Sequence, residues 1–154
     1  MSEAAAAQPL FNIEKLYVKD LSLEIPHAPA IFLEREQPQI DLQLQSNSSA
    51  VGEGVYEVTI TVTVTAKLKE KNQVMFLIEA KQAGIFQLRN LPQEELAPVL
   101  GVVCPNILYP YLREVVSDLA VRAGFAPVLL NPINFDALYQ QQQQQAQGEP
   151  VTTH

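Results

Sequence analysis

The residue types that carry most enzyme chemistry are few in this chain. The two histidines, His27 and His154, stand among prolines and at the last position, and neither has a cysteine or carboxylate nearby at metal-ligand spacing. We expect both to be solvated. The single cysteine, Cys104, precedes a proline in an apolar run, which favours a packed small side chain over a reactive thiol.

Glycines and carboxylates supply no catalytic motif either. The six glycines fit no dinucleotide-binding or phosphate-loop pattern, and no nucleophile elbow occurs. Neighbouring acidic residues, Glu34 with Glu36 and Glu94 with Glu95, are typical of solvated loops and first helical turns. The sequence therefore predicts a protein that is not an enzyme, with no cofactor and no bound metal.

Size and charge narrow the class of protein further. A chain of 154 residues is expected to form one domain. Its formal charge of -7 repels phosphate backbones, so nucleic acid is a poor partner. The first residues of the sequence contain no basic segment typical of a signal peptide, so we expect none. We also expect no membrane-spanning segment, because no run of apolar residues approaches the roughly 20 that a span requires. Together with the single cysteine, this predicts a cytoplasmic protein that does not insert into membranes.

Strict alternation of β-branched and polar residues makes residues 55–68 the clearest predicted strand. A polar turn at 69–73 leads into a second strand over 74–86, which indicates an antiparallel hairpin. In that second strand Val74 and Phe76 are expected on one face, whereas Met75 and Leu77 would make the other face partly apolar.

Two further strands are expected upstream, at 11–25 and 40–45. The first carries Lys15 and Lys19 on its more apolar face, so a β-bulge is expected to shift its register. The proline-containing segment 26–39 and the polar segment 46–54 are predicted loops.

Helical spacing replaces the strand pattern after residue 86. Pro98 is expected to break a short helix that includes Leu96 and Val103. A second helix opens near residue 104, with Pro110 in its first turn, and ends at Gly124. Strands followed by helices predict an α+β fold with a four-stranded antiparallel sheet and two helices. We expect a flexible N-terminus over 1–10, a domain over 11–139 and a disordered glutamine-rich tail over 140–154.

One polar pattern stands out within the predicted sheet. Asp20, Ser22 and Glu24 alternate and therefore point the same way from one strand, as Leu77 and Glu79 do from another. An acidic patch beside an apolar spot is one interpretation of this spacing. An ordinary hydrated sheet face is the other, and spacing does not separate them.

Five ordered blocks of uncommon residues resemble the SecB family of bacterial export chaperones. They read YVKDLSLEIPHAP at 17–29, VYEV at 55–58, KQAGIF at 81–86, CPNILYPY at 104–111 and NPINFDALY at 131–139. The resemblance runs from about residue 11 to residue 139 and implies a homotetramer built as a dimer of dimers. It also implies an ATP-independent holdase that keeps unfolded secretory precursor proteins competent for translocation and delivers them to the ATPase SecA.

The resemblance also assigns residues to three roles. The implied SecA-binding surface consists of Asp20, Glu24, Leu77 and Glu79. The client groove is expected to include Phe32, Pro38, Ile40, Leu42, Leu44, Tyr109 and Leu112, although a core role is as compatible with each. The positions that affect assembly and chaperone behaviour in the family are Phe76, Ile78, Ala80 and Gln82, for which ordinary core packing is the rival interpretation.

Two other functions are compatible with the same fold. A SecB-like chaperone that guards the antitoxin of a stress module would keep the groove and change the partner. A domain that binds a small ligand would instead need an enclosed pocket rather than an open groove.

Overall fold

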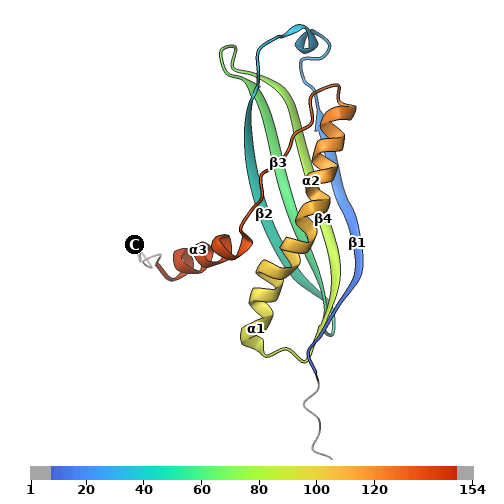
Figure 1. The fold of residues 1–154 in the computed structure, drawn as a ribbon, viewed down its shortest axis with the longest axis vertical. Helices are drawn as coiled ribbons and strands as arrows, with labels where there is room; N and C mark the ends of the chain where they lie inside the picture. Colours follow the sequence, from blue (N-terminus) through green and yellow to red (C-terminus); the bar gives the residue numbers. More distant parts are fainter. Residues whose placement is uncertain (1–7, 149–154) are drawn as a thin grey trace, which may run out of the picture.

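The computed structural model describes residues 8–148 and contains one antiparallel sheet in the strand order β1-β4-β3-β2 (Figure 1). The strands are β1 (Leu10–Glu24), β2 (Gln39–Gly52), β3 (Val55–Leu68) and β4 (Gln73–Arg89). The helices are the 3-10 turn η1 (Ala30–Leu33), α1 (Gln93–Pro98), the π turn η2 (Val99–Val103), α2 (Cys104–Arg122) and α3 (Phe135–Gly148). The predicted α+β class and the four-stranded sheet are confirmed.

The predicted antiparallel hairpin of β3 and β4 is confirmed, and it forms the centre of the sheet. Along β3, Val62 and Val64 are buried while Thr61 and Thr63 on the opposite face are partly exposed. The polar turn is tight, and Asn72 adopts a positive φ of 52° there. Asparagine tolerates this conformation better than most residues do.

The predicted irregularity of β1 is confirmed, and there are two register shifts rather than one. They lie between Ile13 and Lys15 and between Val18 and Asp20. Each leaves one residue unpaired and reverses the alternation of faces. Leu21 and Leu23 therefore share the helix-covered face with their β4 partners, and the opposite face carries Asp20, Ser22 and Glu24, whose partners are Lys81, Glu79 and Leu77.

The start of β4 differs from the prediction. A register shift between Ala66 and Lys67 pairs Val74 with Lys67, whereas Phe76 pairs with the buried Ala66. Val74 and Phe76 consequently do not share a face, and Met75 is buried in the core instead of pointing outward. The bulge is a backbone feature that alternation in the sequence does not encode.

Strand β2 is longer than predicted. The expected loop at 46–54 is wrong for most of its length, because residues 46–50 pair with β3 from Ile60 to Tyr56. Serines and asparagine carry little strand preference. Hydrogen bonds from the neighbouring strand hold this part of β2 in place, with only residues 53–54 left as the turn.

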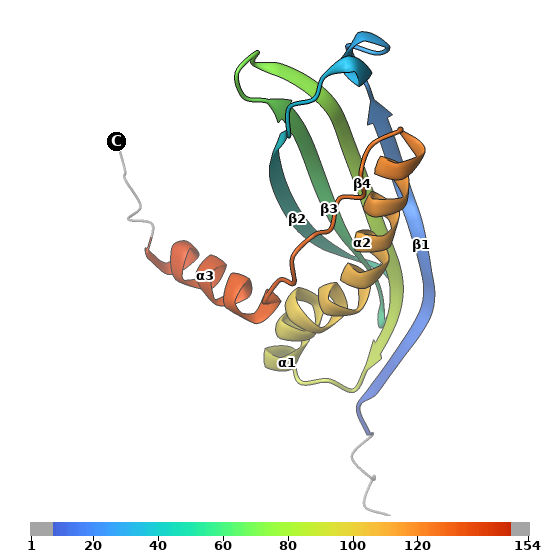
Figure 2. The same ribbon diagram turned by 45° about the horizontal axis from the view of Figure 1, so that its top comes forward.

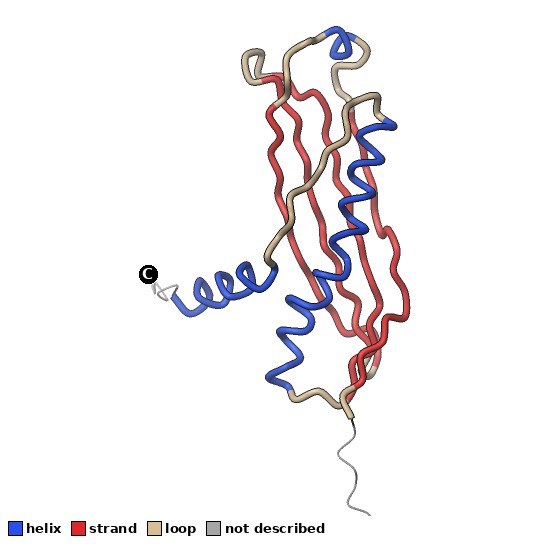
Figure 3. Tube along the Cα trace, in the orientation of Figure 1, coloured by secondary structure: helices blue, strands red, loops and turns tan. Residues whose placement is uncertain are grey.

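The predicted break at Pro98 is also wrong, since helical structure continues from Gln93 to Arg122 (Figure 3). The π turn η2 directly follows Pro98 and relaxes the hydrogen-bond ladder there.

Pro110 lies inside α2 rather than in the first turn of this continuous helix. Its missing N–H leaves a carbonyl on the exposed Asn106, where water can satisfy it. The helix ends as predicted, with Gly124 at a φ of +91°.

This helix is long and apolar enough to cross a membrane by length and composition alone, although the sequence was expected to hold no such stretch. It is the one helix of that kind within residues 8–148. Its inner stripe is fully buried against β3 and β4, at Leu108, Leu112, Val116 and Ala120. The packing is that of a core helix in a globular protein.

All the described helices lie on one side of the sheet, and none of residues 8–148 covers the other side (Figures 1 and 2). We call these the covered face and the open face. After α2 the chain runs as an irregular connector, residues 123–134, along the covered face and then enters α3, which points away from the sheet.

The glutamine run is helical in α3, whereas disorder was expected from residue 140 onward. Asn134 accepts a hydrogen bond through Oδ1 from the backbone N–H of Ala137 at 3.0 Å and so caps the helix. Glutamine is a good helix former, and α3 continues to Gly148. Residues 149–154 of the predicted tail and residues 1–7 of the predicted N-terminal segment lie outside the described residues.

Candidate functional site

A cavity of about 600 Å³ opens between η1, the start of β2 and the connector. Most of the residues that line it are apolar, and Glu34, Glu36, Gln37 and Asn131 add polar groups. Four predicted groove residues line it: Phe32, Pro38, Ile40 and Leu42. Leu42 and Phe32 are 48% and 46% exposed, so the cavity is a groove open to solvent rather than an enclosed pocket. Such a shape is suited to a polypeptide segment.

Aromatic rings form the inner end of this cavity. Phe125 of the connector packs on Phe32 with ring centroids 5.1 Å apart and on Phe76 at 4.7 Å. A side chain at Gly124 would place its Cβ 3.1 Å from Phe32, and the backbone there is left-handed. Gly124 therefore both ends α2 and admits the ring.

A second cavity, of about 540 Å³, adjoins the first along β2. Leu42 and Leu130 line both cavities, and Leu44 and Tyr109 line the second. The two together are called the apolar groove below. The hydroxyl of Tyr109 donates a hydrogen bond to the carbonyl of Asn131 in the connector, and burial raises the pKa of this hydroxyl. Tyr109 thus fixes the path of the connector that forms one wall.

The structure brings six of the seven predicted groove residues to these cavities and leaves out Leu112. That side chain is fully buried beneath α2 and lines neither of them, so we remove it from the groove. The connector wall, which includes Phe125, Leu130 and Ile133, was not predicted from the sequence. A signal for it exists, because apolar residues recur between prolines in a segment without strand or helix periodicity.

The four predicted assembly positions alternate along β4 and all face α2. Phe76, Ile78, Ala80 and Gln82 are each at most 4% exposed. Phe76 also reaches the first cavity, whereas Gln82 is a polar side chain within an apolar layer. Among the described residues, its Oε1 atom has no hydrogen-bond partner.

The predicted acidic patch is assembled by strand register on the open face. Glu24 lies opposite Leu77, and Ser22 lies opposite Glu79, so the four predicted residues share one face of two paired strands. Asp41 of β2 extends the same row across the sheet through Thr65. Sequence spacing could not place Asp41, because its distance from Glu24 depends on the order of the strands. We call Asp20, Glu24, Asp41 and Glu79 with Leu77 the acidic face.

Two observations concern the residues that could hold a metal ion or act as a thiol nucleophile. Within residues 8–148, no group of three or more His, Cys, Asp and Glu side chains is close enough to hold a metal ion. Cys104 is buried, and desolvation raises the pKa of its thiol to about 12, so it stays protonated at neutral pH.

Comparison of the sequence with known proteins identifies the family of this chain. The family model described as "Preprotein translocase subunit SecB" matches residues 4–146. The chain belongs to the SecB family. The protein-export protein SecB of Nitrosomonas eutropha is 65% identical and covers 90% of this chain and 87% of the relative. The protein of the same name from Methylobacillus flagellatus is 59% identical and covers 99% and 98% of the two chains.

A solved structure supports the fold of this SecB-family chain. It is a Mycobacterium tuberculosis SecB-like chaperone in complex with a ChAD peptide from the HigA1 antitoxin, with a TM-score of 0.65. It is 21% identical and covers 80% of this chain and 90% of the other. At that identity the match shows the shared fold. The high-identity relatives are protein-export proteins, which favours export over the antitoxin alternative.

Proposed function

We propose that this chain is a cytoplasmic, ATP-independent holdase that binds unfolded secretory precursors in its apolar groove and delivers them to SecA. The observation that carries the proposal is the open groove itself, in a chain of the SecB family. Exposed apolar walls along β2 and the connector bind side chains of an unfolded segment without needing one particular sequence. Binding rather than catalysis is the activity.

Affinity for an unfolded chain requires more surface than one subunit supplies. A micromolar complex needs about -8 kcal/mol, and ordering the client costs several kcal/mol more. At about 25 cal/mol per Å² the client must bury roughly 1,000 Å² or more. Several subunits that each contribute a groove provide this area and raise avidity for one long client.

Assembly into a dimer of dimers is therefore part of the proposal. Strand β1 is an edge strand of 15 residues with unpaired backbone groups along one side. On the covered face it leaves Ile13, Val18 and Leu21 more than 40% exposed. A long apolar edge is an aggregation hazard unless another chain covers it. A second subunit is the proposed cover.

The proposed SecA contact is the acidic face, with Asp20, Glu24, Leu77 and Glu79 at its centre. Carboxylates around a half-buried leucine suit a partner that carries basic groups around an apolar one. Exposed ion pairs contribute about 0.2–1 kcal/mol each and are screened by salt. The contact should therefore weaken as ionic strength rises.

The first test measures holdase activity directly. Purified protein at a concentration equimolar, as tetramer, with a refolding client should delay aggregation in the absence of ATP. Native mass spectrometry on the same sample should give four copies of the chain. Unchanged aggregation together with a monomeric mass would contradict the proposal.

The second test separates the two surfaces. The variant Asp20→Lys with Glu24→Lys reverses two charges on the open face and should abolish SecA binding while client capture persists. Persistent SecA binding would show that the contact lies elsewhere. An equal loss of client capture would show that the two faces are not independent.

A further inference from the structure

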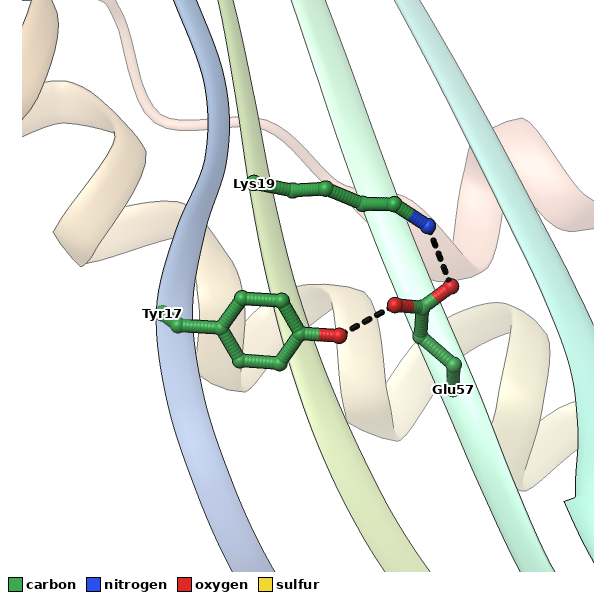
Figure 4. Close-up of polar contacts among 3 residues, drawn as sticks. All are labelled: Tyr17, Lys19 and Glu57. Atoms are coloured by element: carbon green, nitrogen blue, oxygen red, sulfur yellow. Dashed lines mark hydrogen bonds and ion pairs between the residues drawn. The ribbon is translucent and has the colours of Figure 1, made fainter.

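A polar cluster beside the acidic face joins two strands that are not neighbours. Both carboxylate oxygens of Glu57 on β3 are occupied, one by the hydroxyl of Tyr17 and the other by Nζ of Lys19 at 2.7 Å (Figure 4). Tyr17 and Lys19 belong to β1, and β4 runs between the two strands. The β4 residue opposite Tyr17 is Ala83, which is fully buried although it lies on the open face. A small residue there leaves room for these side chains to meet above the sheet.

The second bulge of β1 makes this contact possible. In a regular strand Lys19 and Asp20 would point to opposite faces. The register shift between Val18 and Asp20 leaves Lys19 unpaired, and its ammonium group reaches Glu57 on the open face that Asp20 also occupies. Lys81 of β4 already lies opposite Asp20 on this face. The bulge therefore places a second cation, Lys19, on the acidic face, next to Asp20 in the chain.

The surroundings of Glu57 favour its ion pair with Lys19. Its side chain is 16% exposed, against 44% for Lys19, so the pair is less screened than one in open solvent. The hydrogen bonds from Lys19 and Tyr17 lower the pKa of Glu57 in spite of partial desolvation, and Lys81 adds to the effect. The hydroxyl of Tyr17 stays protonated as a donor, because desolvation and Glu57 raise its pKa to about 12.

We propose that Glu57, oriented by Tyr17, is a positioning residue for partner recognition: it holds the Lys19 ammonium away from Asp20 and so preserves the negative charge of the acidic face. This inference rests on the proposed docking of SecA at that face. Glu57 need not touch SecA. Its role is to prevent a neighbouring lysine from neutralising a carboxylate that does.

The experiment compares three variants in SecA binding at low ionic strength. Glu57→Gln frees Lys19 and should weaken binding about threefold to tenfold, as expected for one misplaced charge near an interface. Adding Lys19→Gln to Glu57→Gln restores the net charge and removes the freed cation, so affinity should return to within about twofold of the original. Glu114→Gln makes the same charge change on an exposed position of α2, on the other side of the sheet, and should leave affinity unchanged.

A second measurement tests the ion pair without SecA. Acetylation of Lys19 by a small reagent, followed by mass spectrometry, should speed up several-fold in Glu57→Gln. The exposed Lys69 is an internal reference whose labelling should stay constant.

The outcomes separate this role from the docking proposal. If the single and double variants bind SecA equally weakly, Lys19 is not the cause and the inference is overturned. It is also overturned if Lys19 labelling does not change. If labelling rises but SecA affinity is unaffected in every variant, Asp20→Lys with Glu24→Lys included, docking at this face is wrong, and the role of Glu57 falls with it.

Discussion

The covered face and the open face of the sheet carry opposite kinds of side chain although they belong to the same four strands. On β3, Val64 is fully buried under the helix while its neighbour Thr63 lies on the uncovered side. The covered face packs α2 at its centre and leaves apolar side chains exposed at its margins, along the groove at β2 and along β1. The open face instead carries polar side chains, among them the carboxylates of the acidic face, the threonines of β3 and the lysines Lys19 and Lys81, with one partly exposed leucine.

This difference indicates how one small domain offers two unlike surfaces for the proposed binding of a client and of SecA. Apolar surface that the helix does not cover is available for an unfolded chain or a second subunit, and charge on the reverse side is available for a basic partner. Because the two surfaces lie on opposite sides of one sheet, a substitution on one should leave the other intact.

The largest effect is expected where the covered face is packed most tightly. Leu112→Ala should destabilise the protein by about 2–5 kcal/mol, because it removes a fully buried side chain and leaves a cavity. Urea unfolding at one fixed protein concentration measures the loss. The adjacent Tyr111→Ala is the control, since Tyr111 is 44% exposed and its loss should cost much less.

An exchange of nearly isosteric residues tests the two faces more directly. Val64→Thr buries a hydroxyl group in an apolar layer and should cost about 1–3 kcal/mol. Thr63→Val, one position away and on the open face, should change stability by less than about 0.5 kcal/mol. Equal effects in urea unfolding would mean that the faces are not distinguished as described.

Client binding should weaken when a negative charge is added to the apolar groove, and it should not change when the same charge is added to the open face. Leu42→Glu places a carboxylate on a residue that lines both cavities and should weaken client binding about tenfold, or about 1.4 kcal/mol. Gln43→Glu adds the same charge to the next residue of β2, which points the other way. Fluorescence anisotropy with a labelled unfolded client compares the two. Similar affinities would place the client outside the apolar groove.

The smallest expected effect is a change in the free energy of unfolding with pH, on the acidic side of neutrality. The pKa of Glu57 is lower in the folded chain than its usual 4.5, so its ion pair stabilises the fold above that pH and loses its effect as the pH falls. Glu57→Gln should therefore be less stable than the original protein by up to about 1 kcal/mol at pH 7. The difference should shrink towards zero below pH 4. A constant difference across this range would assign the loss to packing instead of charge.

Prediction from sequence was most reliable where side chains alternate strictly. The strands around the 69–73 turn follow directly from the threonine and valine pattern of residues 55–68. Prediction failed where the backbone departs from a regular repeat. The bulge near Met75, the π turn after Pro98 and the polar half of β2 depend on hydrogen bonds to neighbouring segments. Propensities of single residues do not include those partners.

The residues of the proposed binding surfaces also include some that were predicted from the sequence and others that were not. Asp20 and Glu24 point the same way from β1, as the spacing indicated, whereas the strand register places Glu79 on their face. Six groove residues came from the family resemblance. The connector wall and the contribution of Asp41 were not predicted. Each depends on which distant segments pack beside one another, information that residue types and local spacing do not contain.

The sequence by itself determined the fold class, the family and the absence of a catalytic motif, because these follow from local alternation, helical spacing and ordered blocks of residues. The tertiary structure alone decided which connector residues complete the groove and how Lys19 is held by Glu57. Packing of the connector beside β2 sets the first. Strand order and the bulges of β1 set the second, since a one-residue shift of register moves every following side chain to the other face.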